Sequence, residues 1–178
     1  MAPEEISLIL ERELPHVVIS HAVSGLHPRI TIAAENLRRV ASLLRDDPRL
    51  GFNTLRCISG IDHIEDGVIT CVYELSAIRP PTKPDAAWLR HADIALQVRV
   101  PRDRAEIPTV SDLWPAANWH ERECFDLLGV TFTGHPDLRR ILCCDDWVGH
   151  PLRRDYEFPL EFHGIPAVTE YGQSRPQH

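Results

Sequence analysis

Residues 119–129, which read WHERECFDLLG, decide how this chain is interpreted. We predict a helix that begins near Pro115, a residue suited to the first helical position, and ends at Gly129, where a left-handed residue is favoured. A capping box over residues 109–112 predicts a short turn just before it. Acids and large apolar residues occur on both faces of this helix, which is unusual for a helix with one buried stripe. Its charged side chains therefore need partners beyond the helix.

The segment that follows the helix is rich in proline and arginine. Residues 134–140 read GHPDLRR, and residues 149–154 echo them with GHPLRR. No apolar period is sustained there, so we predict an α+β domain at residues 1–133 and an extended, partner-docking tail at residues 134–178. The apolar residues expected to anchor the tail are Leu138, Ile141, Leu142, Trp147, Leu152 and Tyr156.

Hydrophobic periodicity before the key helix predicts the rest of the domain. Helical spacing indicates helices at residues 4–14 and 34–45, and β-branched or alternating runs indicate strands at 17–19, 30–32, 52–61, 68–75 and 92–100. Asp66-Gly67 is typical of a hairpin turn, whereas the proline-rich residues 79–85 predict a loop. The fold class is therefore α+β, with helices packed on one face of a mainly antiparallel sheet and an extended C-terminal tail.

Composition excludes several classes of function. The chain has 178 residues, 43% of them hydrophobic, and a net charge of −7, which argues against a nucleic-acid partner because phosphate binding needs a basic surface. No apolar run approaches the roughly 18 residues of a membrane span. The acidic N-terminus does not resemble a secretory signal, and five cysteines, an odd number, favour reduced cytosolic thiols. We therefore expect contact with a membrane only through partner subunits.

Three carboxylates of the key helix, Glu121, Glu123 and Asp126, are candidates for acid–base catalysis. No nucleophile or metal motif accompanies them, so we favour charge pairing, with Arg122 neutralising them and facing Asp126 four residues on. Residues 120–124 resemble the zinc motif HExxH but lack its second histidine. Vicinal Cys143-Cys144 is more simply two small, half-buried residues than a redox pair.

The paired arginines of the tail are mixed with acids. Four arginines between residues 134 and 158 face five acids, so the segment has no basic field for a phosphate or lipid. Arginine is favoured at protein interfaces for bidentate pairing with carboxylates. These arginines are therefore expected to pair with acids on partner proteins.

The pattern as a whole resembles the 30-kDa-type subunit family of NADH:quinone oxidoreductase, respiratory complex I, whose bacterial members carry the letter C. The likeness is dense over residues 107–156 and fainter over residues 52–100. The signature and interface residues that carry it are Trp119, Glu121, Arg122, Glu123, Asp126, Gly129, His135, Pro136, Arg139, Arg140, His150, Pro151, Arg153, Arg154 and Asp155. The chain departs from the family at Cys143-Cys144 and after Tyr156.

The resemblance implies a cofactor-free, quinone-module scaffold subunit of a proton-translocating NADH:quinone oxidoreductase, without catalytic, cofactor-binding or metal residues of its own. NADH, FMN, iron–sulfur clusters and quinone would lie in partner subunits. It further implies complex I subunits D, B and I as partners, and a peripheral place on the cytoplasmic face of the bacterial plasma membrane.

Two alternatives remain open from the sequence. One is the equivalent subunit of a complex-I-like membrane-bound hydrogenase or of a ferredoxin- or deazaflavin-linked oxidoreductase, which neighbouring genes would distinguish. The other is a stand-alone thiol or metal enzyme, which metal analysis and thiol titration of the purified chain would reveal.

Overall fold

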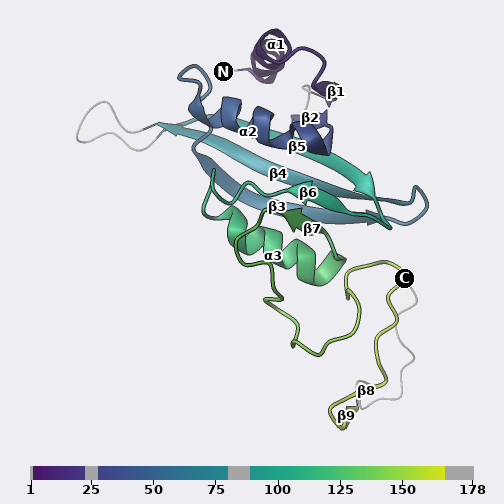
Figure 1. Ribbon diagram of the computed structural model, residues 1–178. Coiled ribbons are helices and arrows are strands. Elements are labelled where there is room, and N and C mark those ends of the chain that lie inside the picture. The colour runs from purple at the N-terminus through teal and green to yellow at the C-terminus, as the bar shows by residue number, and fades with distance from the viewer. Residues whose placement is uncertain (1, 23–27, 80–88, 167–178) are drawn as a thin grey trace.

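The computed structural model describes residues 2–22, 28–79 and 89–166, and a five-stranded sheet forms its centre (Figure 1). The strands are β1 (Val18–Ala22), β2 (Arg29–Ile32), β3 (Thr54–His63), β4 (Val68–Arg79) and β5 (Leu89–Pro101). They lie in the order β1-β2-β5-β4-β3. All neighbours are antiparallel except β2 and β5, which run parallel. The predicted, mainly antiparallel sheet is confirmed.

The strand register explains which face of the sheet is buried. Ile58, Tyr73 and Leu96 lie side by side on β3, β4 and β5, and all three are buried. Their neighbours on the other face include Ile61 and Arg99, which are exposed. The central strand β4 pairs on both edges, which accounts for its apolar run, and Gly67 makes the predicted hairpin turn with a φ of +65°. The predicted loop at residues 79–85 lies outside the described residues apart from Arg79, which ends β4.

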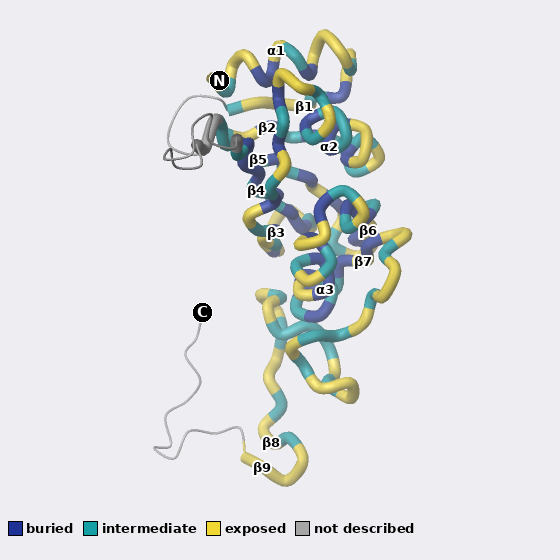
Figure 2. The backbone as a smooth tube through the Cα atoms, turned by 90° about the vertical axis from the view of Figure 1, so that its left-hand side faces the viewer, coloured by how far each residue is buried: buried dark blue, intermediate teal, exposed yellow. Residues whose placement is uncertain are grey.

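Helices and a small second sheet cover the buried face. They are α1 (Pro3–Glu13), a 3-10 turn (Ala34–Asn36), α2 (Leu37–Asp46) and α3 (Ala117–Leu128), with β6 (Glu106–Pro108) and β7 (Thr131–Thr133) paired in parallel around α3. Leu37, Val40, Ala41 and Leu44 form the buried stripe of α2, as its helical spacing predicts. Figure 2 shows α2, β6 and β7 beside one face of the sheet, with α3 next to β3.

Close packing of α3 against β3 depends on Gly60. A Cβ atom at this position would lie 2.2 Å from Leu128 Cδ1 and 3.6 Å from Cys124 Sγ. The helix therefore rests on the bare backbone of the edge strand, and this contact fixes the position of everything that α3 carries.

The start of α3 differs from the prediction. The helix begins at Ala117, and Pro115 lies before its N-cap, where its carbonyl accepts a hydrogen bond from Asn118 N–H. The predicted capping box is wrong, because Asp112 turns away to form a bidentate ion pair with Arg38. The C-terminal end is as predicted: Gly129 has a φ of +73° and its N–H bonds the carbonyl of Phe125.

The chain after Gly134 runs beneath α3 and ends in a small hairpin of β8 (Glu161–Phe162) and β9 (Ile165–Pro166) (Figure 1). Of the apolar anchors predicted for it, Leu138, Ile141, Trp147 and Tyr156 are half-buried. Leu142 and Leu152 are instead 63% and 58% exposed. Anchoring by those two leucines was wrong, because polar contacts with α3 hold this part of the chain.

Candidate functional site

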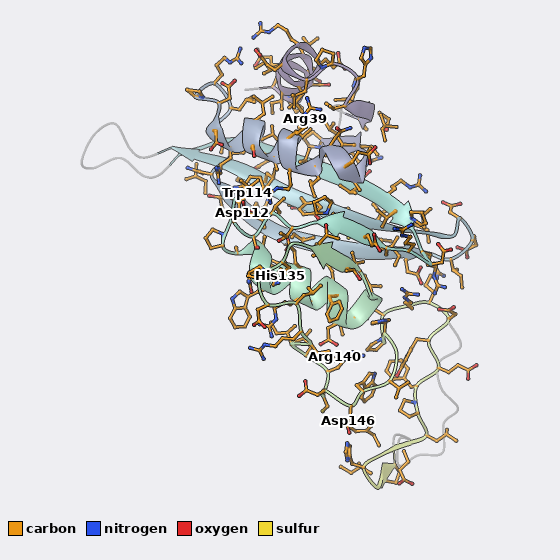
Figure 3. All side chains as sticks on the ribbon, viewed as in Figure 1. Arg39, Asp112, Trp114, His135, Arg140 and Asp146 are labelled. Atoms are coloured by element: carbon orange, nitrogen blue, oxygen red, sulfur yellow. The ribbon has the colours of Figure 1, made fainter. Side chains whose placement is uncertain are left out.

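The carboxylate of Asp126 is the centre of the contact between α3 and the tail. It is fully buried, and one oxygen accepts hydrogen bonds from three consecutive backbone N–H groups, those of Ile141, Leu142 and Cys143, at 3.0, 2.7 and 2.8 Å. The other oxygen accepts a bond of 2.6 Å from Arg140 Nη1. The tail therefore turns around one acidic side chain of the helix (Figure 3).

Hydrogen bonding keeps this carboxylate ionised. Burial alone raises the pKa of Asp126, because it removes water from the charge, but the three N–H donors and Arg140 outweigh burial. The net effect is a pKa well below the ordinary range of an aspartate. Asp126 is thus a fixed negative charge at physiological pH, which suits a structural contact rather than proton transfer.

The tail also satisfies the last carbonyls of α3, which have no partner inside the helix. His150 Nδ1 lies 2.9 Å from Asp126 O, Leu152 N–H donates to Leu127 O at 3.0 Å, and Arg153 Nε donates to Leu128 O at 2.8 Å. The cationic arginines at this end also complement the negative pole of the helix. The second GHPLRR-like repeat therefore serves as a C-terminal cap supplied from 24 residues downstream.

Gly129 is required here for two reasons. Its positive φ favours glycine, and a Cβ atom would lie 2.5 Å from His150 Nε2 and 3.0 Å from Arg153 Nη2. The bare backbone thus permits both the turn after α3 and the close approach of the tail.

Arg122 holds the tail from the side of the helix. Its Nε and Nη2 atoms donate to the carbonyls of Arg139 and Arg140 at 3.2 and 3.0 Å, and its guanidinium stacks 5.7 Å from the ring of Trp119. The expected pairing of Arg122 with Asp126 was wrong, because Arg140 supplies the cation for Asp126. The guanidinium of Arg140, expected to pair with a partner protein, is thus occupied within the chain.

A second anchor joins the tail to the sheet through Asp62. Arg102 binds this buried carboxylate through both oxygens, at 2.8 and 3.1 Å, and the backbone N–H of Arg154 donates to it at 2.9 Å. Arg102 also pairs with Asp155. Burial raises and the Arg102 and Arg154 hydrogen bonds lower the pKa of Asp62, with a net decrease.

Glu121 faces the opposite side of α3 from Asp126 and is also fully buried. Its carboxylate accepts bonds from Thr109 Oγ1 and from Val110 N–H, the latter at 2.8 Å, and His135 Nε2 lies 3.9 Å away. Burial raises the pKa of Glu121 to about 7, against the lowering effect of these hydrogen bonds. The environment of Glu121 is thus the reverse of that of Asp126.

His135 fixes the root of the tail. Its Nδ1 accepts a bond of 3.0 Å from Asp137 N–H, so its Nε2 carries the proton and donates to Asn118 O at 3.2 Å. This arrangement requires the neutral ring. The neighbouring Pro136 lines an open groove of about 920 Å³ together with Trp119, whose side chain is 64% exposed.

The remaining residues of the predicted set lie at the surface of the junction. Glu123 is 3.9 Å from His120, and Arg139 pairs with Asp137 in an exposed contact. Pro151 lies half-buried between His150 and Leu152. The sequence did not indicate Thr109, Asp62 or Arg102 as site residues, since each is an isolated polar residue whose partner is distant in the chain.

Metal and thiol chemistry receive no support from the described residues. Among residues 2–22, 28–79 and 89–166, no group of three or more histidine, cysteine, aspartate or glutamate side chains is placed to hold a metal ion. Cys57, Cys71, Cys124, Cys143 and Cys144 are all free thiols. In the same part of the chain, no helix is both long and apolar enough to cross a membrane.

A family comparison assigns the chain. The model of a family described as the 30 Kd subunit of respiratory-chain NADH dehydrogenase matches residues 30–161, which include α3, both tail anchors and the sheet from β2 onward. This chain belongs to that family. The segment that places Asp126 and Arg140 together thus lies inside the part of the chain that the 30-kDa family shares.

Relatives named as the C subunits of NADH-quinone oxidoreductases agree with this assignment. The protein from Chlorobium phaeobacteroides is 44% identical over 126 residues, which are 71% of this chain and 70% of that protein. The protein from Moorella thermoacetica is 40% identical over 152 residues, 85% of this chain and 93% of that protein. In a longer relative from Chloroherpeton thalassium, the match spans 48% of the protein.

Two solved structures share the fold. A trypsin-resistant fragment of Nqo5 superposes with a TM-score of 0.59 and 29% identity, over 76% of this chain and 99% of the fragment. A chain of an archaeal membrane-bound sulfane sulfur reductase superposes with a TM-score of 0.74 over 98% of both chains, at 22% identity. The second likeness concerns the fold alone.

Proposed function

We propose that this chain is a structural subunit in the quinone module of a proton-translocating NADH:quinone oxidoreductase, and that its tail docks it onto neighbouring subunits. The observation that carries the proposal is the combination of a tail pinned to α3 by buried polar contacts with apolar side chains left exposed on the same tail. Large exposed apolar residues in the described tail are Leu142, Val148, Leu152, Phe158, Leu160 and Ile165.

Exposed apolar groups in this number favour burial against another protein. An exposed patch of large side chains rimmed by polar residues is typical of an interaction site. The polar anchors explain how such a segment keeps one conformation before it meets its partner, which lowers the entropy lost on docking. We accordingly take residues 1–133 as the folded domain and residues 134–178 as the docking tail. The relative solved as a trypsin-resistant fragment, which matches 76% of this chain, supports that division.

The redox chemistry belongs to partner subunits in this proposal. Both anchoring carboxylates, Asp126 and Asp62, are already occupied by donors of their own chain, so neither is available to a cofactor or metal. NADH, FMN, iron–sulfur clusters and quinone would accordingly bind elsewhere in the complex, with subunits D, B and I next to this chain. The complex would lie against the cytoplasmic face of the bacterial plasma membrane, with this subunit peripheral.

Charged substitutions in the tail test the docking role. In the native host, an affinity-tagged chain carrying Val148→Asp and Leu160→Asp should lose its co-purifying subunits, because a buried apolar contact is replaced by an unpaired charge. Leu8→Asp and Ile19→Asp are matched controls, since these residues are 65% and 67% exposed but lie on α1 and β1. Equal recovery of partner subunits with both variants would overturn the docking role of the tail.

A second candidate keeps the fold but changes the complex. The likeness to a chain of an archaeal sulfane sulfur reductase complex shows that this fold is not confined to NADH-linked enzymes. The equivalent subunit of a membrane-bound hydrogenase or of a ferredoxin- or deazaflavin-linked oxidoreductase is therefore the alternative. Mass spectrometry of the subunits that co-purify from native membranes distinguishes them: an NADH-binding subunit supports the first candidate, and a nickel–iron subunit supports the second.

A further inference from the structure

The buried carboxyl of Glu121 stands apart from the docking contacts. Its oxygens are met by Thr109 and Val110, and within the described part of the chain no lysine or arginine forms an ion pair with it. Buried ionised carboxylates are ordinarily paired with a cation or donated to by several N–H groups, as Asp126 is. Glu121 has one backbone donor and one hydroxyl, which leaves its charge poorly compensated.

Two hydroxyl groups connect this carboxyl to solvent. Thr109 Oγ1 hydrogen-bonds Glu121 Oε2, and Ser111 Oγ lies 2.8 Å from the same Thr109 Oγ1. Thr109 and Ser111 both line the open groove beside Trp119, and Ser111 is partly exposed. An unbroken row of hydrogen bonds thus leads from groove water to a carboxyl that has no direct exposure of its own.

We propose that Glu121 is a proton-binding site that exchanges its proton with the open groove through the hydroxyls of Thr109 and Ser111. In the ionised state, the Thr109 hydroxyl donates to Glu121 and the Ser111 hydroxyl donates to Thr109. When a groove water gives a proton to Ser111 Oγ, Ser111 passes its own proton to Thr109 and Thr109 passes its own to Glu121. The carboxyl gains one proton, both hydroxyls are regenerated with their bonds reversed, and the water is left one proton short.

The electrostatic surroundings agree with a site that changes its charge under ordinary conditions. Burial raises the pKa of Glu121 to about 7, so both protonation states are populated near neutral pH. Of the charged groups nearby, Asp112 raises and Arg38 lowers this pKa, and the two are paired with each other. The nearby groups that remain neutral are His135 at the root of the tail, Cys124 on α3, and Cys71 and Tyr73 on β4.

Tyr73 is the second unusual group in this region. It is 1% exposed, and its hydroxyl has no hydrogen-bond partner among the described residues. Burial raises its pKa first, and the charges of Cys71 and Glu121 add to the increase, so the hydroxyl stays protonated. A neutral phenol here adds no charge to stabilise an ionised Glu121, which leaves proton binding as the way to relieve the buried charge.

Carbon-13 NMR of the full chain, with glutamate side chains labelled, tests the site directly. The Glu121 carboxyl carbon, assigned by its loss in Glu121→Gln, should titrate with a midpoint near neutrality between about pH 5 and about pH 9. Relaxation dispersion of the same carbon reports how fast the proton exchanges. A carboxyl carbon that keeps one protonation state across this range would overturn the proposal, even if the Gln variant did not fold and assignment came from the wild-type spectrum.

The relay is tested by removing its outer hydroxyl. Ser111→Ala leaves every bond of Glu121 in place, so the midpoint should stay near its wild-type value while exchange slows by about tenfold or more. Ser59→Ala, at an exposed serine on β3 outside the groove, should change neither quantity. Exchange in Ser111→Ala that is as fast as in Ser59→Ala would contradict the route through the two hydroxyls.

Discussion

The carboxylate of Asp126 and the guanidinium of Arg140 lie 2.6 Å apart, and their contact ties α3 to the tail within a single chain. The side chain of Asp126 is fully buried and that of Arg140 is 18% exposed. Because three backbone N–H groups bind the same carboxylate, the position of the tail depends on one acidic side chain. This dependence makes the contact open to mutation.

Asp126→Ala should release the first part of the tail. Removing one partner of a buried ion pair costs about 3–5 kcal/mol, because the other charge and its donors lose their partner. We expect amide hydrogen exchange to accelerate strongly at Ile141, Leu142 and Cys143. Asp137→Ala is the matched control: its pair with Arg139 is 55% and 69% exposed, and such pairs contribute about 0–1 kcal/mol. Unchanged exchange in Asp126→Ala would contradict the anchoring role.

Gly129→Ala should destabilise the chain more than Gly67→Ala does. Both glycines have positive φ angles, so alanine costs about 1–2 kcal/mol at either position from the backbone alone. A Cβ atom at Gly67 meets nothing within 4 Å, whereas one at Gly129 lies 2.5 Å from His150. The difference between the two midpoints of chemical denaturation therefore measures the contact of the tail with α3. Equal destabilisation would mean that His150 does not pack there.

Asp62→Asn should loosen the second tail anchor. The amide keeps the size of the side chain but removes the charge that Arg102 binds at two oxygens, so the Arg154 amide should exchange faster with solvent. The matched control is Asp66→Asn, which alters an ion pair with Arg99 in which both side chains are at least half exposed. Equal, slow exchange of the Arg154 amide in the two variants would show that Asp62 does not hold the tail.

Stability should fall as the pH rises from about 4.5 to about 7, and Glu121 should be the cause. The pKa of Glu121 is raised from 4.5 in the unfolded chain to about 7, so the folded state binds more protons over this window. The expected loss is on the order of 3 kcal/mol. Asp126 acts in a different window: its lowered pKa stabilises the fold above the ordinary aspartate range, and this contribution is lost as the pH falls further.

Urea denaturation at a series of pH values measures this slope. Glu121→Gln cannot titrate, so its free energy of unfolding should vary much less between about pH 4.5 and about pH 7. An identical slope in the variant and the parent chain would contradict the assignment to Glu121.

The elements of the fold were largely predictable because their signals are local. Helical spacing located α1 and α2, and alternation located β3, β4 and β5, although β4 and β5 extend beyond the predicted ends. The left-handed end of α3 follows from glycine chemistry at Gly129. The start of α3 was misplaced because Asp112, which the capping box requires, is drawn away by Arg38, 74 residues earlier.

The partners in the site were beyond the reach of local patterns. Arg122 and Asp126 have the spacing of a helical ion pair, so pairing within α3 was the natural expectation. The actual partners come from the tail, and those of Asp62 lie 40 and 92 residues away in the chain. Sequence spacing carries no information on such distances, which are fixed only once α3 has packed on Gly60.

The most direct test of the structural role is the complex purified from native membranes with Arg122→Ala in this chain. Arg122 binds two carbonyls of the tail, so we predict a reduced yield of complex that contains all of its subunits. The complexes that do assemble should reduce quinone at the parental rate. A normal yield with every subunit present, together with lost quinone reduction, would contradict the account, because it would place Arg122 in the chemistry rather than in the docking of the tail.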